Sequence, residues 1–273
     1  MPDVRHDSAI TAFQQKRGGD SAAFFVPFLT ADVTLLDVGC GPGTITAALA
    51  EIVGMAVGVD IEPSAIAAAD RLAKGTGPTN LAFVEADMTA LPFEDETFDA
   101  VFCHAVLYHQ SRAMLTRTLA EARRVLKPGG VLGTRDADVG GNILHPELDG
   151  VRLALELWQR WYEHDDPDAL CFGRRQSSIL RAHGFTPVWA GASYVNHSAD
   201  AASRIEAVAD ARRSLAAIVT RSTREWAFIF RITLPRCAFT VISLMPSSPP
   251  TCLFKSPETT NAMTSRSRRL SEA

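Results

Sequence analysis

The sequence lacks the cysteine patterns and long apolar runs that mark several large classes of protein. Five cysteines, at positions 40, 103, 171, 237 and 252, are scattered over 273 residues, and no two form a CxxC pair. This spacing argues against a zinc site or a disulfide framework, so we expect no metal and a reducing, cytoplasmic environment. No apolar run approaches the roughly 20 residues that a membrane-spanning helix needs. The mixed charges of the first seven residues are not typical of a secretory signal.

Basic charge is also scarce, with 27 Lys and Arg against 31 Asp and Glu and a formal net charge of −4. A chain with this balance has no general attraction to nucleic acid or to anionic membranes, so we expect neither as a partner. The composition is 47% hydrophobic and 21% charged. These fractions suit one α/β domain with additions and a substantial core. The oligomeric state stays open.

Strand and helix patterns alternate from residue 33 onward. Strand patterns cover residues 34–38, 56–60, 81–85, 100–104 and 131–135, and helix patterns cover residues 44–53, 63–74 and 111–126. This alternation indicates right-handed βαβ units and therefore a parallel sheet. Before it, residues 8–29 read as helix, with a break at Gly18 and Gly19. We assign residues 1–30 to an N-terminal helical lid.

The second half of the chain follows a different pattern. A helical insertion is predicted at about residues 140–170, followed by a helix at 174–183 that ends at Gly184. A strand at 186–195, a helix at 199–221 and a last strand at 238–244 complete a domain over residues 31–245. Residues 246–273 are rich in Ser, Pro and Thr, which predicts a disordered tail. A shifted reading frame or a retained intron near residue 228 would produce the same change in composition.

The loop after the first strand is the most informative segment of the chain. Asp37 is followed by Gly39, Gly41 and Gly43, and then by a helix pattern. Glycine permits positive φ and a close approach of the backbone to a ligand at the carboxyl end of a buried strand. The spacing is GxGxG, not the GxGxxG that binds a pyrophosphate. The Asp37 carboxylate would repel phosphate but suits an ammonium or a sulfonium, and S-adenosylmethionine (SAM) carries both.

Further acids follow the next two strands. Asp60 ends the second strand, and an acid about 20 residues after a glycine loop can bind both hydroxyls of a ribose, although this fits NAD equally well. Asp87 and Met88 follow the third strand, where a carboxylate and a backbone N–H can bind the amino edge of an adenine. Ile61 and Met88 would form its apolar walls. These residues favour an adenosine ligand.

Four segments, read together, resemble one known family. They are LLDVGCGPG, VGVDIEPSAI, EADMTALPFEDETFD and RVLKPGG, in this order and spacing. They resemble class I SAM-dependent methyltransferases, in particular the branch of ubiquinone and menaquinone biosynthesis, over about residues 17–195. The resemblance implies an α/β fold with a doubly wound, mostly parallel, Rossmann-like sheet. It also implies SAM as the cofactor and a small-molecule acceptor that is methylated on carbon, nitrogen or oxygen by in-line displacement.

The resemblance also implies a role for each matching position. Asp37 and the three loop glycines would surround the methionine part of SAM, and Asp60 would bind the ribose. Asp87 and Met88 would bind the adenine, and the backbone carbonyl of Cys103 would face the amino group of SAM. The N-terminal helices would close over the cofactor.

Three residues are candidates for the acceptor side. His109 follows the fourth strand, and its near-neutral pKa would let it accept a proton from an amine or a phenol; alternatively it packs against the backbone. Arg135 and Asp136 end the fifth strand and either orient a polar substrate or pair with each other. Because a fold does not fix chemistry, a non-catalytic SAM-binding protein and a nucleotide-dependent oxidoreductase remain alternatives.

Overall fold

The computed structural model describes residues 18–76, 78–142, 169–194 and 237–244, together with residues 152, 153, 155, 156 and 159. Several predicted segments lie outside these residues: the first part of the N-terminal lid, most of the 140–170 insertion, the helix at 199–221 and the tail at 246–273. The five described residues between 152 and 159 are helical. Among the described residues, no helix is long and apolar enough to cross a membrane.

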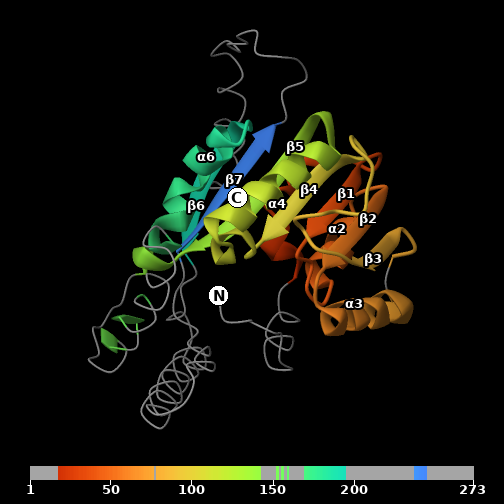
Figure 1. The fold of residues 1–273 in the computed structure, drawn as a ribbon. Helices are drawn as coiled ribbons and strands as arrows, with labels where there is room; N and C mark the ends of the chain where they lie inside the picture. Colours follow the sequence, from red (N-terminus) through yellow and green to blue (C-terminus); the bar gives the residue numbers. More distant parts are fainter. Residues whose placement is uncertain are drawn as a thin grey trace, which may run out of the picture.

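A seven-stranded sheet forms the centre of the molecule (Figure 1). Its spatial order is β3-β2-β1-β4-β5-β7-β6; the first five strands are parallel, and β7 runs antiparallel to both neighbours. The strands are β1 (Thr34–Val38), β2 (Met55–Asp60), β3 (Leu81–Glu85), β4 (Phe98–His104), β5 (Leu126–Asp138), β6 (Thr186–Tyr194) and β7 (Cys237–Leu244). The predicted doubly wound, mostly parallel α/β sheet is confirmed.

Helices cover both faces of the sheet. They are α2 (Thr44–Ala50), α3 (Pro63–Thr76), α4 (Arg112–Val125) and α6 (Phe172–Ala182). Leu35 and Leu36 point to opposite faces because side chains alternate along a strand. Leu35 enters a core with α2 and Phe25, whereas Leu36 enters a core with the inner faces of α4 and α6. Gly184 has φ +85 just after α6, as predicted for its C-cap.

The N-terminal segment differs from the prediction. Residues 18–29 form two short 3-10 turns, η1 (Gly19–Ala22) and η2 (Val26–Phe28), in place of an α-helix. Pro27 lies at the start of η2, where it lacks the N–H that a continuing α-helix would need. Phe25, between the turns, is fully buried and stacks on Phe102 of β4. Burial of this ring, rather than helix propensity, therefore fixes the segment against the sheet.

The direction of winding reverses between β1 and β4. The chain moves outward through β2 and β3 and then returns to the other side of β1 to form β4 and β5. In open α/β sheets, ligands bind beyond the carboxyl ends of the strands at such a point. The loops after β1 and β4 both lie there, so the fold places the predicted site residues at one edge.

Candidate cofactor and active site

The glycine loop joins β1 to α2 and is held by backbone bonds. The N–H groups of Gly39 and Cys40 both donate to the carbonyl oxygen of Val59, at 2.8 and 2.9 Å. Gly39, Gly41 and Gly43 have φ of +74, +56 and +79, which residues with a Cβ rarely adopt. A Cβ at Gly39 would overlap with Val106 in the loop after β4. This position needs glycine both for its φ and for the approach of a neighbouring loop.

Two buried carboxylates flank this loop. Asp37 is 2% exposed and accepts a 2.6 Å bond from the hydroxyl of Thr46 in the first turn of α2. Asp60 is 7% exposed and accepts from the N–H groups of Gly41 and Glu62, at 2.9 and 3.0 Å. The pKa of Asp37 is raised to about 7: burial raises it most, the bond from Thr46 opposes this rise, and the nearby charge of Asp60 adds to it. Among the described residues, no basic side chain pairs with either acid.

The predicted adenine residues lie beside this pair. The N–H of Ala86 donates to the carbonyl oxygen of Asp60, which joins the loop after β3 to the end of β2. Asp87 is exposed, and its Oδ1 accepts from the N–H and the hydroxyl of Thr89, both at 2.8 Å. Met88 is half-buried against the core, whereas Ile61 is 60% exposed. An apolar side chain this exposed next to two acids suits the face of a planar ring.

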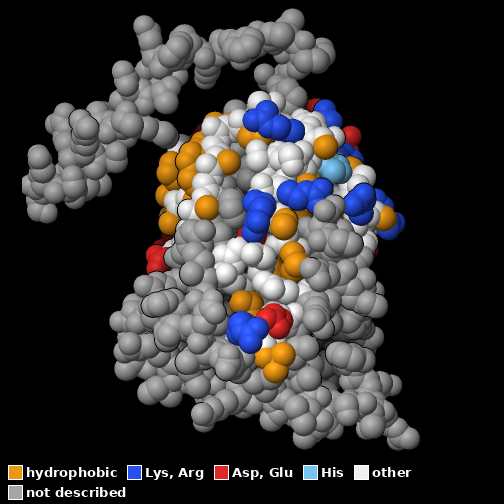
Figure 2. Space-filling view, turned by 90° about the vertical axis from the view of Figure 1, so that its left-hand side faces the viewer, with side chains coloured by type: hydrophobic (Ala, Val, Ile, Leu, Met, Phe, Trp, Pro, Cys, Tyr) orange, Lys and Arg blue, Asp and Glu red, His pale blue; other side chains and the backbone are white. Residues whose placement is uncertain are grey.

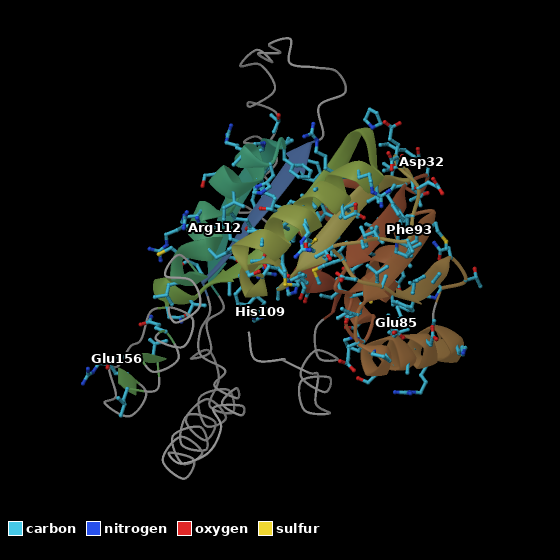
Figure 3. The ribbon with its side chains drawn as sticks, in the orientation of Figure 1. Asp32, Glu85, Phe93, His109, Arg112 and Glu156 are labelled. Atoms are coloured by element: carbon cyan, nitrogen blue, oxygen red, sulfur yellow. The ribbon has the colours of Figure 1, made fainter. Side chains whose placement is uncertain are left out.

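The loop after β4 carries the predicted catalytic histidine. Cys103 ends a buried stretch of the strand, and burial raises the pKa of its thiol well above the usual range, which opposes a role as nucleophile. Ala105 then has φ +58. His109 follows in the 3-10 turn η3 (Leu107–His109), half-buried, with its ring centroid 3.8 Å from that of Tyr108. Figure 3 shows His109 at the edge of the sheet, beneath α4.

Asp136 holds this loop in place. Its Oδ1 accepts from the N–H groups of Val106 and Leu107, both at 3.0 Å, and from Tyr108 at 3.4 Å. The side chain is 1% exposed, and burial raises its pKa to about 7 against these bonds. Asp136 does not pair with Arg135, whose guanidinium lies on the opposite face of β5 and donates to Ser21 and Ser193. The alternative that the two residues pair with each other is therefore wrong.

Two contributors were missed at the sequence level. Thr46 bonds Asp37, and Gln176 of α6 donates to both Asp136 and Thr134 at 2.7 Å. Gln176 is fully buried between Phe172 and Leu180, in the middle of the buried stripe of its helix. A glutamine at the centre of an apolar stripe was a readable signal, because buried amides are kept where they have polar partners.

A second surface of the described residues lies away from this edge. Figure 2 shows basic side chains gathered on the side of the molecule that carries α6. A hollow between α4 and α6, near the amino ends of β4 and β5, is lined by Arg123, Arg124 and His183, among others. Arg124 forms ion pairs with Glu121 and Asp95. The hollow contains none of the predicted site residues.

Comparison with known proteins agrees with this geometry. Residues 35–130 match the model of the methyltransferase domain family. A SAM-dependent methyltransferase from Methanosarcina mazei has the same fold, with a TM-score of 0.55 and 19% identity over 83% of this chain and 98% of that one. Residues 35–130 of this chain form a methyltransferase domain, with the fold of SAM-dependent methyltransferases. The predicted family and its cofactor, SAM, are thereby confirmed.

Curated relatives of this methyltransferase domain include enzymes of different kinds. A probable methyltransferase, ltbC, of Aspergillus luteorubrus is 37% identical over 165 residues, which are 57% of this chain and 58% of the relative. Demethylmenaquinone methyltransferase of Shouchella clausii is 36% identical over 103 residues, 37% of this chain and 43% of the enzyme. The chain thus spans about half the length of these relatives.

Proposed function

We propose that this protein transfers a methyl group from SAM to a carbon, nitrogen or oxygen atom of a small-molecule acceptor. One observation carries the proposal: Asp37 and Asp60 lie buried beside the glycine loop, and no described basic side chain neutralises them. Buried carboxylates without a counter-charge are costly, and a cationic ligand offsets that cost. The donor set therefore fits a positively charged nucleoside.

We infer for each cofactor residue the role that the family resemblance implies. Asp60 would bind the ribose hydroxyls while its bond to Gly41 shapes the loop. Asp37 would stabilise the cationic methionine part, and the carbonyl of Cys103 would face its amino group. Asp87 would bind the adenine edge, with Met88 and the exposed Ile61 against the ring.

The acceptor side needs alignment more than strong acid–base chemistry. Bound SAM supplies an electrophilic methyl group on a positively charged sulfur. Holding the acceptor in line with that group can lower a barrier by about 7–11 kcal/mol in ideal cases. Asp136 fixes the backbone of the loop that carries His109, and His109 would accept a proton from the acceptor. The demethylmenaquinone-methylating relative supports a small, ring-containing acceptor.

The two other functions predict different ligands. A nucleotide-dependent oxidoreductase would have to place a pyrophosphate beside Asp37, where a carboxylate repels it. A non-catalytic SAM-binding protein would bind SAM yet methylate no acceptor. Calorimetric titration with S-adenosylhomocysteine and with NAD distinguishes the oxidoreductase, which would bind NAD, from the methyltransferase. A screen of quinols, phenols and amines with labelled SAM distinguishes the non-catalytic protein, which would label none of them.

Asp60 provides the test of the site. Asp60→Ala removes charge-assisted bonds to two hydroxyls, each worth about 1.5–3 kcal/mol, so affinity for S-adenosylhomocysteine should fall by roughly a hundredfold or more. Asp60→Asn keeps a carbonyl acceptor for Gly41 and should fold normally while still binding weakly. Asp32→Ala, a change at an exposed acid, is the control. If both Asp60 variants bind S-adenosylhomocysteine with unchanged affinity, Asp60 does not bind the cofactor.

A further inference from the structure

Arg135 is a half-buried cation in β5. Its guanidinium donates to the carbonyl oxygen of Ser21 at 3.4 Å and to the hydroxyl of Ser193 at 3.1 Å. Among the residues that the structure describes, no carboxylate pairs with it. Burial lowers the pKa of Arg135, which records the cost of desolvating this charge. A buried arginine is normally paired, and the described residues supply no anion for this one.

The strand register places Arg135 at the ligand edge. Val38 is paired with Cys103, and Cys103 with Thr134, so Arg135 lies level with the first residue after β1, which is Gly39. Two strand spacings, about 10 Å, separate β5 from β1. Arg135 thus lies beside the cofactor loop but too far along the sheet to form part of its floor.

The two neighbours of Arg135 come from segments that border this edge. Gly133, two residues earlier on the same face, lies against the ring of Phe25, so the side chain points to the face that the N-terminal turns cover. Ser21 belongs to the first of those turns, and Ser193 is near the end of β6. The guanidinium therefore lies between the N-terminal turn η1, strand β5 and the end of strand β6.

We propose that Arg135 binds an oxyanion, a carboxylate or a phosphate, on the methyl acceptor. The inference rests on the proposed function and adds to it the charge of the substrate. A guanidinium has five donors in a planar fork that matches such groups with two parallel bonds, and the described residues supply partners for only two of these donors. The carboxylate of SAM could also bind a guanidinium. However, Arg135 lies two strands from the glycine loop, and this position favours binding to the acceptor over binding to the cofactor.

The test observes the Arg135 side chain directly and needs no identified acceptor. Protein labelled with 15N-arginine is saturated with S-adenosylhomocysteine, and the Arg135 Nε–H signal is identified by its loss in Arg135→Lys. Benzoate and inorganic phosphate are then titrated, with neutral benzamide as the matched probe. At least one anion should shift this signal to saturation, and benzamide should not. In calorimetry, Arg135→Gln should weaken the binding of that anion at least tenfold. Arg117→Gln, a change at an exposed arginine of α4, is the control and should leave anion binding unchanged.

Two results would overturn the inference. One is that neither anion shifts the Arg135 signal. The other is that S-adenosylhomocysteine itself shifts the signal while 5′-methylthioadenosine, which lacks the carboxylate, does not; Arg135 would then bind the cofactor. Failure of the proposed function is a separate outcome, because it appears as an absence of S-adenosylhomocysteine binding in calorimetry, and the anion titration can be read without that ligand.

Discussion

Replacing Asp37 by asparagine should change how the stability of the protein depends on pH. Burial raises the pKa of Asp37 from 3.8 to about 7. Between these values the unfolded chain releases a proton that the native protein keeps, so the wild-type free energy of unfolding falls as pH rises. Each pH unit costs about 1.4 kcal/mol, which amounts to roughly 4 kcal/mol over the window. The amide that Asp37→Asn introduces cannot ionise and still offers a carbonyl oxygen to Thr46.

Urea unfolding of both proteins between pH 4 and pH 8 measures this difference. The free energy of unfolding of Asp37→Asn minus that of wild type should rise by roughly 4 kcal/mol from pH 4 to pH 7 and then level off. Asp32→Asn is a control of opposite sign, because the hydroxyl of Thr30 lowers the pKa of that exposed acid. Its difference from wild type should decrease slightly near pH 4 and then stay level up to pH 8, because the titration of this acid lies mostly below pH 4. A difference for Asp37→Asn that stays constant from pH 4 to pH 8 would refute the reasoning.

Two further variants probe the acceptor side. His109→Gln should lower kcat by about 10²–10⁴-fold without weakening S-adenosylhomocysteine binding, if His109 accepts a proton; a loss of only a few-fold would exclude that role. Asp136→Ala should destabilise the fold by about 3–5 kcal/mol in urea unfolding, because it leaves several buried N–H groups without an acceptor. Asp136→Asn should destabilise the fold much less, because the carbonyl oxygen of the new amide can replace Oδ1. The side chain of Gln176 can then rotate so that its Oε1, which has no partner, accepts from the NH2 group of the new amide. Equal losses in the two Asp136 variants would contradict this account.

The sequence predicted the sheet well because local signals mark its strands. The predicted ranges of β1 and β3 agree with the structure to the residue, and β7 begins one residue earlier than expected. Short apolar runs bounded by Gly and Pro are enough to locate a buried strand. The ends of β5 were harder to predict. The strand runs from Leu126 to Asp138, because Leu126 already pairs with Phe98 of β4, and the register shifts over Pro128-Gly129-Gly130 before Val131 pairs with Ala100.

The roles of the polar residues were less predictable. Asp136 was expected to face a substrate or Arg135, but its partners are 28–40 residues away in sequence. Arg124, in the RVLKPGG segment, bonds Glu121, Asp95 and two backbone carbonyls, and no sequence pattern predicted these partners. Such partners depend on which side chains face each other across packed layers, and period and propensity carry no information about that.

The contact between Gly39 and Val106 links the two halves of the site. Val106 fills the space that a Cβ at Gly39 would need, and its own N–H is held by Asp136. The glycine loop therefore cannot shift toward the loop after β4 without displacing the segment that carries His109. A cofactor that orders the first loop would shape the second before an acceptor arrives, which favours a compulsory order of addition in which SAM binds first.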